Sequence, residues 1–390
     1  MARWGGRFLL LVASVLVPLL LLEAALRLFG PILPGNYNTG NFLAPHTRYG
    51  RFHVLNFDGW VKTSEFVSHI RINQLGLRGP DRPYAKPADV QRILVLGDSF
   101  VEAVQVPEAS TAVSRLEAAL NARDPGRYEV LNGGIGGWGT GQQLVYLREE
   151  GYQYQPDLVL VVLFLGNDIF DNSYTLQGRP RTVHEPYFVF RPDGSFEPLE
   201  FRNRRPEEVN PAVAELRQRS LLWNVFETGV LAKVSESEND AALRANRFNL
   251  NKMLIHRVRS TDRQDDAWRT TLTLLQRVRQ LGDERGFKTA VVLAPASFQV
   301  QDAEWARLLD DNDLKADEWA ADLPNAVLAA NAQMVGAPML DLLPALYAAT
   351  EDGSPLYYPY DKHWTAAGHA IAAEEIERFL REQGLVARQG

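Results

Sequence analysis

Apolar runs of strand length recur along the chain, separated by amphipathic stretches. The runs are QRILVLG at 91–97, YEVLNGG at 128–134, DLVLVVLFLG at 157–166, TAVVLAP at 289–295 and the shorter PMLDL at 338–342. Strands that are apolar throughout are typical of a parallel sheet covered by helices on both faces. The pattern therefore predicts an α/β fold, a three-layer αβα sandwich with a mainly parallel central sheet.

Helical periodicity fills the intervals between these runs. Apolar residues at helical spacing include Val113, Leu116 and Leu120 after the first run, and Trp268, Leu272, Leu275 and Val278 before the fourth. Further helices are expected near 142–150, between the last two runs, and after Trp364 at the end of the chain. Strands and helices thus alternate in the order that a parallel sheet needs for its crossover connections.

The alternation stops after Asp168. A hairpin is predicted in PYFVFRPDGSFEPLEF at 186–201, because Pro192, Asp193 and Gly194 supply turn chemistry between two strand-like pieces. A helix near Ser220 and a polar patch, SESEND at 235–240, follow. We interpret residues 169–263 as a lobe inserted into the α/β domain.

The first 30 residues have the pattern of a membrane-targeting segment. Arg3 and Arg7 precede a run without charges from Phe8 to Leu22, and apolar residues continue beyond Glu23. An uncleaved signal anchor, a transmembrane helix, is favoured over a cleaved signal peptide because no convincing A-x-A site follows the run. The basic N-terminus would stay in the cytoplasm, which places the rest of the chain outside it, in the periplasm or at the cell surface.

Three regions follow from these patterns: an anchor at 1–30, an irregular extension at 31–90, and an α/β domain at 91–390 that contains the insertion. The extension is rich in Gly, Asn, Pro and aromatic residues, and its strand-like pieces are short, for example EFVSHIRIN at 65–73. We expect the extension to pack on the α/β domain.

Composition narrows the chemistry. With 46% hydrophobic and 23% charged residues, the chain of 390 residues is typical of globular proteins. The net charge of −7 provides no basic field for nucleic acid, so nucleic acid is not expected as a partner. The absence of cysteine excludes thiol catalysis, disulfides and thiolate metal sites.

Three successive strands end in groups suited to acyl chemistry. GDSFVEA places Ser99 after the first strand, NGGIGGWGTG places a run of glycines after the second, and LGNDIFDN places Asn167 after the third. The carboxyl ends of parallel strands form the ligand-binding edge of open α/β sheets. A hydroxyl nucleophile, backbone N–H groups free of side chains and an amide donor would therefore meet at one edge. Taken singly, each feature is also compatible with an ordinary turn or a helix cap.

A base for Ser99 is available near the end of the chain. In YYPYDKHWTAAGH, Asp361 and His363 lie two residues apart ahead of a helix that Thr365 would cap. Histidine accepts a proton near neutral pH, and a carboxylate fixes its tautomer. A metal site with His369 as a further ligand is disfavoured, because His369 would lie inside the helix. His369 is expected to pack instead.

The four blocks GDSF, NGGIGG, GND and DKHW resemble those of the SGNH or GDSL-type hydrolases, in the family's order. The resemblance implies an SGNH-hydrolase or flavodoxin-like fold with Ser99 as nucleophile, His363 as base and Asp361 as its orienting partner. It also implies an oxyanion hole formed by the backbone N–H of Ser99, the N–H of Gly137 and the side chain of Asn167. No metal and no organic cofactor are implied.

Two features differ from many members of that family. One residue, Lys362, separates Asp361 from His363 where two are common, and this spacing resembles the membrane-associated, polysaccharide-acetylating branch. The insertion at 169–263 is also longer than in compact members. The stretch NQLGLRGPD at 73–81 resembles a segment of anchored relatives, in which Arg78 is expected to pair with a carboxylate.

The resemblance implies an extracytoplasmic serine ester hydrolase that acts through an acyl-enzyme. Its expected substrates are O-acetyl esters of envelope carbohydrates or small acyl esters. The alternative is an O-acetyltransferase to a polysaccharide, which would need a multi-spanning partner because one apolar segment cannot carry an acetyl donor across a membrane. A second alternative is a non-catalytic, anchored glycan-binding or scaffold protein.

Overall fold

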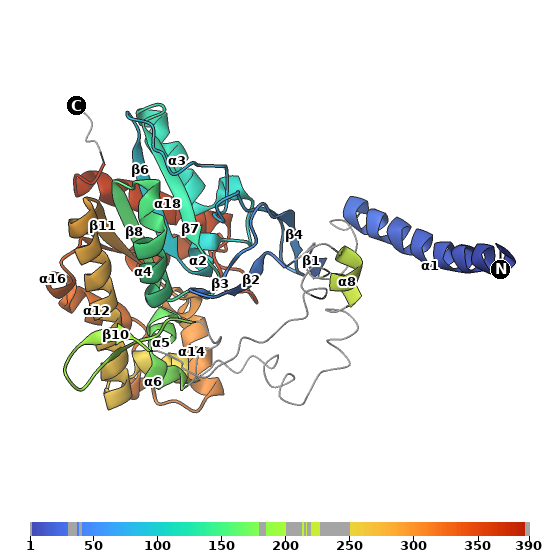
Figure 1. Cartoon of the computed structure of the whole chain (residues 1–390). Helices are drawn as coiled ribbons and strands as arrows, with labels where there is room; N and C mark the ends of the chain where they lie inside the picture. The colour runs from blue at the N-terminus through green and yellow to red at the C-terminus, as the bar shows by residue number, and fades with distance from the viewer. Residues whose placement is uncertain are drawn as a thin grey trace.

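The computed structural model describes residues 2–29, 37–38, 41–178, 185–199, 213, 216, 220–226 and 250–386. A five-stranded sheet lies at the centre of the α/β domain (Figure 1). Its strands are β6 (Gln91–Gly97), β7 (Tyr128–Gly134), β8 (Leu158–Phe164), β11 (Lys288–Ala294) and β12 (Met339–Asp341). Four match the predicted apolar runs closely, and β12 forms the core of PMLDL.

All five strands run parallel in the order β7-β6-β8-β11-β12. Numbered along the sheet's own strands, this order is 2-1-3-4-5, the flavodoxin-like order. The order reverses between β6 and β8, so the crevice for a ligand is expected where β6 and β8 end. The predicted α/β class, the parallel sheet and the flavodoxin-like arrangement are confirmed.

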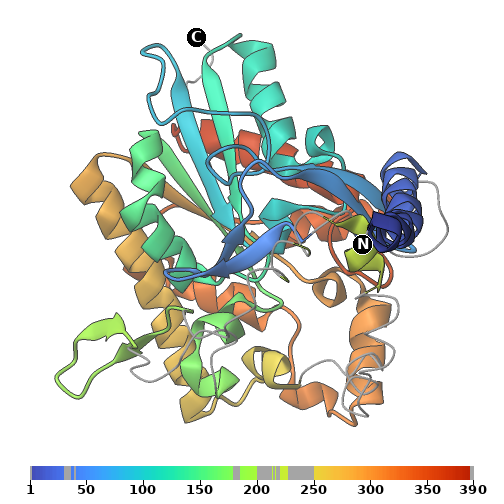
Figure 2. The ribbon, with the colours of Figure 1, turned by 45° about the vertical axis from the view of Figure 1, so that its right-hand side comes forward.

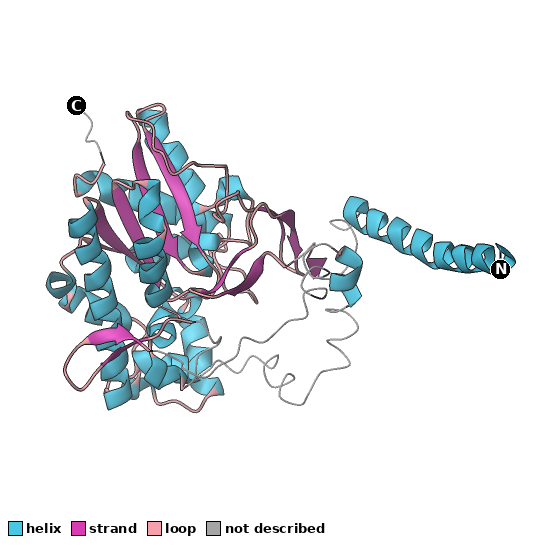
Figure 3. Cartoon of the chain, in the orientation of Figure 1, coloured by secondary structure: helices cyan, strands magenta, loops and turns pink. Residues whose placement is uncertain are grey.

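Helices cover both faces of the sheet, as Figure 3 shows. The bounds of the helices are α1 (Ala2–Phe29), α2 (Ser99–Glu102), α3 (Ala112–Arg123), α4 (Thr140–Glu149), α5 (Asp168–Asn172), α6 (Tyr174–Gln177), α8 (Leu221–Phe226), α11 (Leu250–Met253), α12 (Asp262–Arg285), α13 (Ser297–Val300), α14 (Asp302–Asp311), α15 (Leu323–Ala330), α16 (Ala332–Val335), α17 (Leu343–Ala349) and α18 (Ala366–Glu382).

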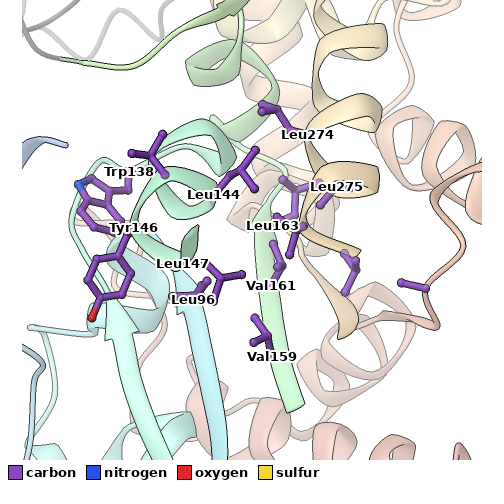
Figure 4. Packing of buried hydrophobic residues seen from close by; sticks show 14 of the residues in the cluster. Leu96, Trp138, Leu144, Tyr146, Leu147, Val159, Val161, Leu163, Leu274 and Leu275 are labelled. Carbon is purple, nitrogen blue, oxygen red and sulfur yellow. The ribbon is translucent and has the colours of Figure 1, made fainter. Parts of the chain in front are cut away.

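Alternate residues of β6 enter two separate cores. Leu94 and Leu96 belong to the core on the side of α4 and α12, together with Leu144 and Leu275. Figure 4 shows Leu96 beside Leu147 of α4. Ile93 and Val95 belong to the opposite core, beneath α3 and α18. Both faces are therefore buried, which explains why the strands are apolar throughout.

The extension forms two small antiparallel sheets. One pairs β2 (Leu43–His46) with β3 (Gly50–His53), and the other has the order β1-β4-β5, formed by Tyr37–Asn38, Asp58–Lys62 and Val67–Arg71. The extension is joined to the main sheet by a bridge between Arg78 and Asn132 of β7. It therefore packs on the α/β domain, as expected.

The predicted hairpin is present within the insertion. β9 (Phe188–Phe190) pairs with β10 (Phe196–Pro198), and the turn is fixed by Gly194 at φ +83° and by the Asp193 carboxylate, which accepts the Ser195 N–H. The hairpin projects from the side of the domain (Figure 2). The helix expected near Ser220 is α8, and the SESEND patch lies outside the described residues.

The N-terminal segment is a single helix, α1, that extends away from the α/β domain (Figure 1). Its part Leu10–Phe29 is long and apolar enough to cross a membrane, and none of it is buried inside the protein. Glu23 accepts hydrogen bonds from the backbone of Leu221 and Leu222, so α8 lies against the end of α1.

Candidate active site

The turn after β6 presents Ser99 at the carboxyl edge of the sheet. Asp98 caps α2 by accepting the N–H of Phe100, with 2.9 Å between Oδ1 and N, and Ser99 is the first residue of that helix. Gly97 makes the turn possible, because a Cβ there would lie 2.3 Å from Cγ2 of Val101. The backbone thus fixes the position of the Ser99 hydroxyl.

Ser99, His363 and Asp361 form one hydrogen-bonded chain. The distance from Ser99 Oγ to His363 Nε2 is 2.7 Å, and the distance from His363 Nδ1 to Asp361 Oδ1 is also 2.7 Å. With Nδ1–H donating to the carboxylate, Nε2 can accept the serine proton. The structure therefore brings together, across 264 positions of the sequence, the nucleophile, base and orienting acid that the motifs predict.

The loop that carries Asp361 and His363 closes on itself. The N–H of Tyr358 donates to the carbonyl of His363 and that of Lys362 donates to the carbonyl of Tyr358. Lys362 lies in the left-handed region at φ +68°, which turns the chain so that the side chains on either side of it meet. The His363 ring packs against Phe100, with 4.7 Å between the ring centroids.

Two pKa values at the site depart from their ordinary range. Burial opposes the charge of His363, but the hydrogen bond and negative charge of Asp361 outweigh it and raise the pKa of His363 above 6.5. Burial raises the pKa of Asp98 to about 6, although the N–H of Phe100 and the charge of His363 lower it. Asp98 thus lies directly before the nucleophile as a buried carboxyl with one oxygen on a backbone N–H.

Of the three expected oxyanion donors, Asn167 and Gly137 are placed differently with respect to the cavity. Asn167, at the start of α5, lines the same cavity as Ser99, and its Oδ1 is buried without a hydrogen-bond partner in the described part of the chain. Gly137 lies in the loop between β7 and α4 with φ +76° and is not among the residues that line that cavity. The backbone N–H of Gly137 in an oxyanion hole therefore stays a prediction.

A cavity of about 680 Å³ opens at Ser99, Asp361 and His363. Phe164, Phe298 and Leu308 form apolar parts of its wall. Polar residues line the remainder: Lys252, Glu304, Arg307, Asp311, Asn312 and Lys362. Much of this wall is formed by α14. An ion pair of 2.9 Å between Lys362 and Glu304 joins α14 to the loop that carries Asp361 and His363.

Most residues of this wall were not predicted from the sequence. Lys252 and the residues of α14 carry no motif, and Asp302–Asp311 reads as an ordinary amphipathic helix. Only the tertiary fold brings them to Ser99. Strand ends do contribute to the wall: Ser99 follows β6, Gly166 and Asn167 follow β8, and Ala296 and Ser297 follow β11.

His369 packs, as expected. It is buried on α18, its ring meets Trp364 edge to face, and its Nδ1 accepts the N–H of Ala112 at 3.3 Å. Burial lowers its pKa to about 3, so it is neutral under ordinary conditions. Within the described ranges, no group of three His, Asp or Glu side chains is arranged to hold a metal ion.

Two buried side chains of the extension bind α2, the short helix that begins at Ser99. Arg78 donates to the carbonyls of Glu102, Ala103 and Val106, at and just beyond the end of α2. His53 bonds Glu102 through Nε2, with 2.7 Å to Oε1. Among the described ion pairs none joins Arg78 to a carboxylate, although burial lowers its pKa and the charges of Glu102 and Glu108 act on it against that effect. The guanidinium instead donates to backbone carbonyls, because α2 ends at Glu102 and the C-cap Ala103, at φ +56°, turns the chain away.

We expect Arg78→Met to lower the free energy of unfolding by on the order of 3 kcal/mol, because it strands several buried carbonyls without donors. Arg71→Met is the matched control, since Arg71 is exposed and its only ion pair within the described part of the chain, with Glu108, spans 3.6 Å. The control should cost less than about 1 kcal/mol. Urea unfolding of the full chain in detergent measures both, and equal losses would contradict the role given to Arg78.

One family model matches the C-terminal third of the chain. Residues 255–390 match the family described as SGNH hydrolase-like domain, acetyltransferase AlgX. The matched part contains Asp361 and His363, while Ser99 and Asn167 lie before it. With this match, the resemblance to the SGNH hydrolases is confirmed. Comparison with curated proteins gave no match.

Solved structures give fold-level likenesses. A catalytic mutant of Axe2, an acetylxylan esterase from Geobacillus stearothermophilus, is 12% identical over 76% of this chain and 96% of that chain, with a TM-score of 0.39. The psychrotrophic esterase EstA from Pseudoalteromonas sp. is also 12% identical, over 76% of this chain and 100% of that chain, with a TM-score of 0.38.

Proposed function

We propose that this protein is a serine esterase that cleaves O-acyl esters, chiefly acetyl esters, of envelope carbohydrates through an acyl-enzyme. The single observation that carries the proposal is the hydrogen-bonded chain of Ser99, His363 and Asp361 at the mouth of the cavity. A serine held 2.7 Å from a histidine that is itself oriented by a carboxylate is an activated nucleophile.

The reaction has two steps. Ser99 Oγ attacks the ester carbonyl as its proton passes to His363 Nε2, and the oxyanion that forms is held by the side chain of Asn167 and the backbone N–H groups of Ser99 and Gly137. The alkoxide leaves with the proton from His363. Water, deprotonated by His363, then attacks the acyl-enzyme and releases the acid and Ser99.

The proposed location is outside the cytoplasm, anchored by α1. The apolar stretch Leu10–Phe29 has the length of a membrane span, and Arg3 and Arg7 precede it, so the positive-inside rule supports this orientation. A carbohydrate substrate fits a cavity whose wall combines charged side chains and Asn312 with aromatic rings. The acyl group would reach Ser99 while the sugar lies along α14.

Acetyl transfer is the second candidate, because the matched family is described as an acetyltransferase. In that case an acceptor hydroxyl replaces water in the second step, and a multi-spanning partner supplies the acetyl donor. In the alternative of a non-catalytic, glycan-binding protein, the same cavity would bind a glycan and no ester would be hydrolysed. These three possibilities differ in what happens to an acetyl group on Ser99.

Covalent labelling tests the proposal. The full chain in detergent is treated with a fluorophosphonate, and a single adduct on the peptide containing Ser99 is expected, with loss of ester turnover in parallel. Isotope-labelled acetyl ester, with and without an oligosaccharide acceptor, then separates free acetate from acetylated acceptor. Label that moves to the acceptor faster than to water favours transfer. A folded protein that takes no label and turns over no ester would contradict both catalytic candidates.

A further inference from the structure

A carboxylate from the extension binds the loop that carries Asp361 and His363. Glu65 Oε2 accepts the N–H of Asp361 at 2.7 Å, and Glu65 Oε1 accepts the N–H of Tyr360 at 3.0 Å. Both oxygens of one side chain thus engage two successive amides of the loop. Hydrogen bonds from backbone N–H groups to a carboxylate are among the stronger ones in proteins.

The position of Glu65 is itself fixed by its own turn. Glu65 lies in the connection between β4 and β5, where Thr63 Oγ1 accepts the N–H groups of Glu65 and Phe66. The N–H of Thr63 donates to the carbonyl of Phe66 and closes the turn. The buried ring of Phe66 packs on Tyr358, with 5.4 Å between centroids. The hairpin therefore meets the loop with both a charged and an apolar contact.

The loop needs such an external hold. It has no regular secondary structure apart from a bridge between Tyr357 and Trp364, and Lys362 occupies a left-handed conformation that a side chain disfavours. Tyr360 is 83% exposed, so its side chain contributes little packing. An error of about 1 Å in the position of a catalytic group costs up to on the order of 100-fold in rate.

We propose that Glu65 is a positioning residue that holds the Asp361–His363 loop in the geometry required by Ser99. Glu65 is not itself among the residues that line the cavity, and it acts through the backbone of Tyr360 and of Asp361, which does line it. This inference rests on the proposed function. It assigns part of the catalytic apparatus to the extension and not to the α/β domain alone.

The inference also connects the site to the membrane anchor. β4, which leads into the Glu65 turn, pairs with β1, where Tyr37 lies opposite Lys62. β1 is the first described strand after α1 ends at Phe29. The β4–β5 hairpin, which carries Glu65, thus pairs with a strand of the segment that follows α1. A fragment beginning at residue 91 would lack this hairpin. The full chain is therefore the form to test.

Glu65→Gln is the sharpest variant, because glutamine keeps the length of the side chain but has one oxygen. Its NH2 group would face one of the two loop amides, donor against donor. We expect kcat for 4-nitrophenyl acetate to fall about 10- to 100-fold while KM changes by less than about twofold. Hydrogen exchange of the peptide segment 358–363 should become on the order of tenfold faster. A general loss of folding would not separate kcat from KM in this way.

Asp58→Asn is the matched control. Asp58 lies on the same hairpin, is exposed, and bonds His69 and not the loop. This variant should leave kcat and the exchange of 358–363 within about twofold of wild type.

Two results would overturn the role of Glu65: unchanged exchange in Glu65→Gln, whether or not the protein turns over esters, or faster exchange with unchanged kcat in an enzyme that Ser99→Ala inactivates. If wild type turns over no ester, the proposed function fails instead, and the exchange result still decides whether Glu65 holds the loop.

Discussion

Ser99→Ala is expected to lower kcat/KM for acetyl esters by at least about 10⁴-fold, the loss typical of removing the nucleophile of a serine hydrolase. The change removes only the hydroxyl group, whose hydrogen bond to His363 Nε2 is the contact that activates Ser99. The fold should not suffer, since Asp98 and not Ser99 caps α2. Initial rates with 4-nitrophenyl acetate, together with fluorophosphonate labelling, measure the effect.

Ser114→Ala is the matched control for this change. Ser114 lies on α3 and is not among the residues that line the cavity. The substitution makes the same chemical change, the loss of one serine hydroxyl, at a position outside that lining. The control should keep its rate and its label. Turnover by Ser99→Ala within about tenfold of wild type would mean that another group attacks the ester, and the chain of Ser99, His363 and Asp361 would then be a structural feature.

The α/β core could be predicted because both faces of its strands are buried. β8 is apolar along its whole length and β6 along most of it, so their bounds are visible in the sequence as runs. The edge strand β12 is only partly buried, and it was visible as the short run PMLDL. In contrast, β2 and β3 have mixed burial and occur among Gly and aromatic residues, where no periodicity identifies a strand.

Ser99, Gly137 and Asn167 were predicted from strand ends, and this approach works only for groups attached to the sheet. Asp361 and His363 were predicted from their spacing ahead of a helix and from the DKHW block. Ser99 and Asn167 follow strands directly, so topology alone places them at one edge. Glu65 and Arg78 act from the extension, through hydrogen bonds to backbone groups of other segments. Their partners carry no side-chain signature, because any residue has an N–H or a carbonyl. Residue types and spacing therefore do not reveal these contacts; the resemblance of NQLGLRGPD pointed to Arg78 but not to its carbonyl partners, and Glu65 was not indicated at all.

Asp361→Asn is the second variant with a large expected effect, and it tests the orientation of the base. The asparagine NH2 group can donate to His363 Nδ1, which places the ring proton on Nε2, where it faces Ser99 Oγ and can no longer accept the serine proton. We expect a loss of kcat on the order of 10⁴-fold with the fold retained. Asp302→Asn, on the exposed start of α14, is the control for an acid-to-amide change and should retain full activity.

The pH profile of this variant separates orientation from simple damage. His363 must be neutral to act as a base, so kcat/KM rises as the pH increases through its pKa. Asp361 raises that pKa above 6.5 by its hydrogen bond and charge, against the effect of burial. Without the carboxylate, burial still lowers the pKa, and only the weaker raising effects of the Asp98 charge and of the backbone carbonyl of residue 361 oppose it, so the acid limb of the residual activity should move to lower pH. An acid limb that stays in place would show that His363 is not the base whose titration limits the reaction.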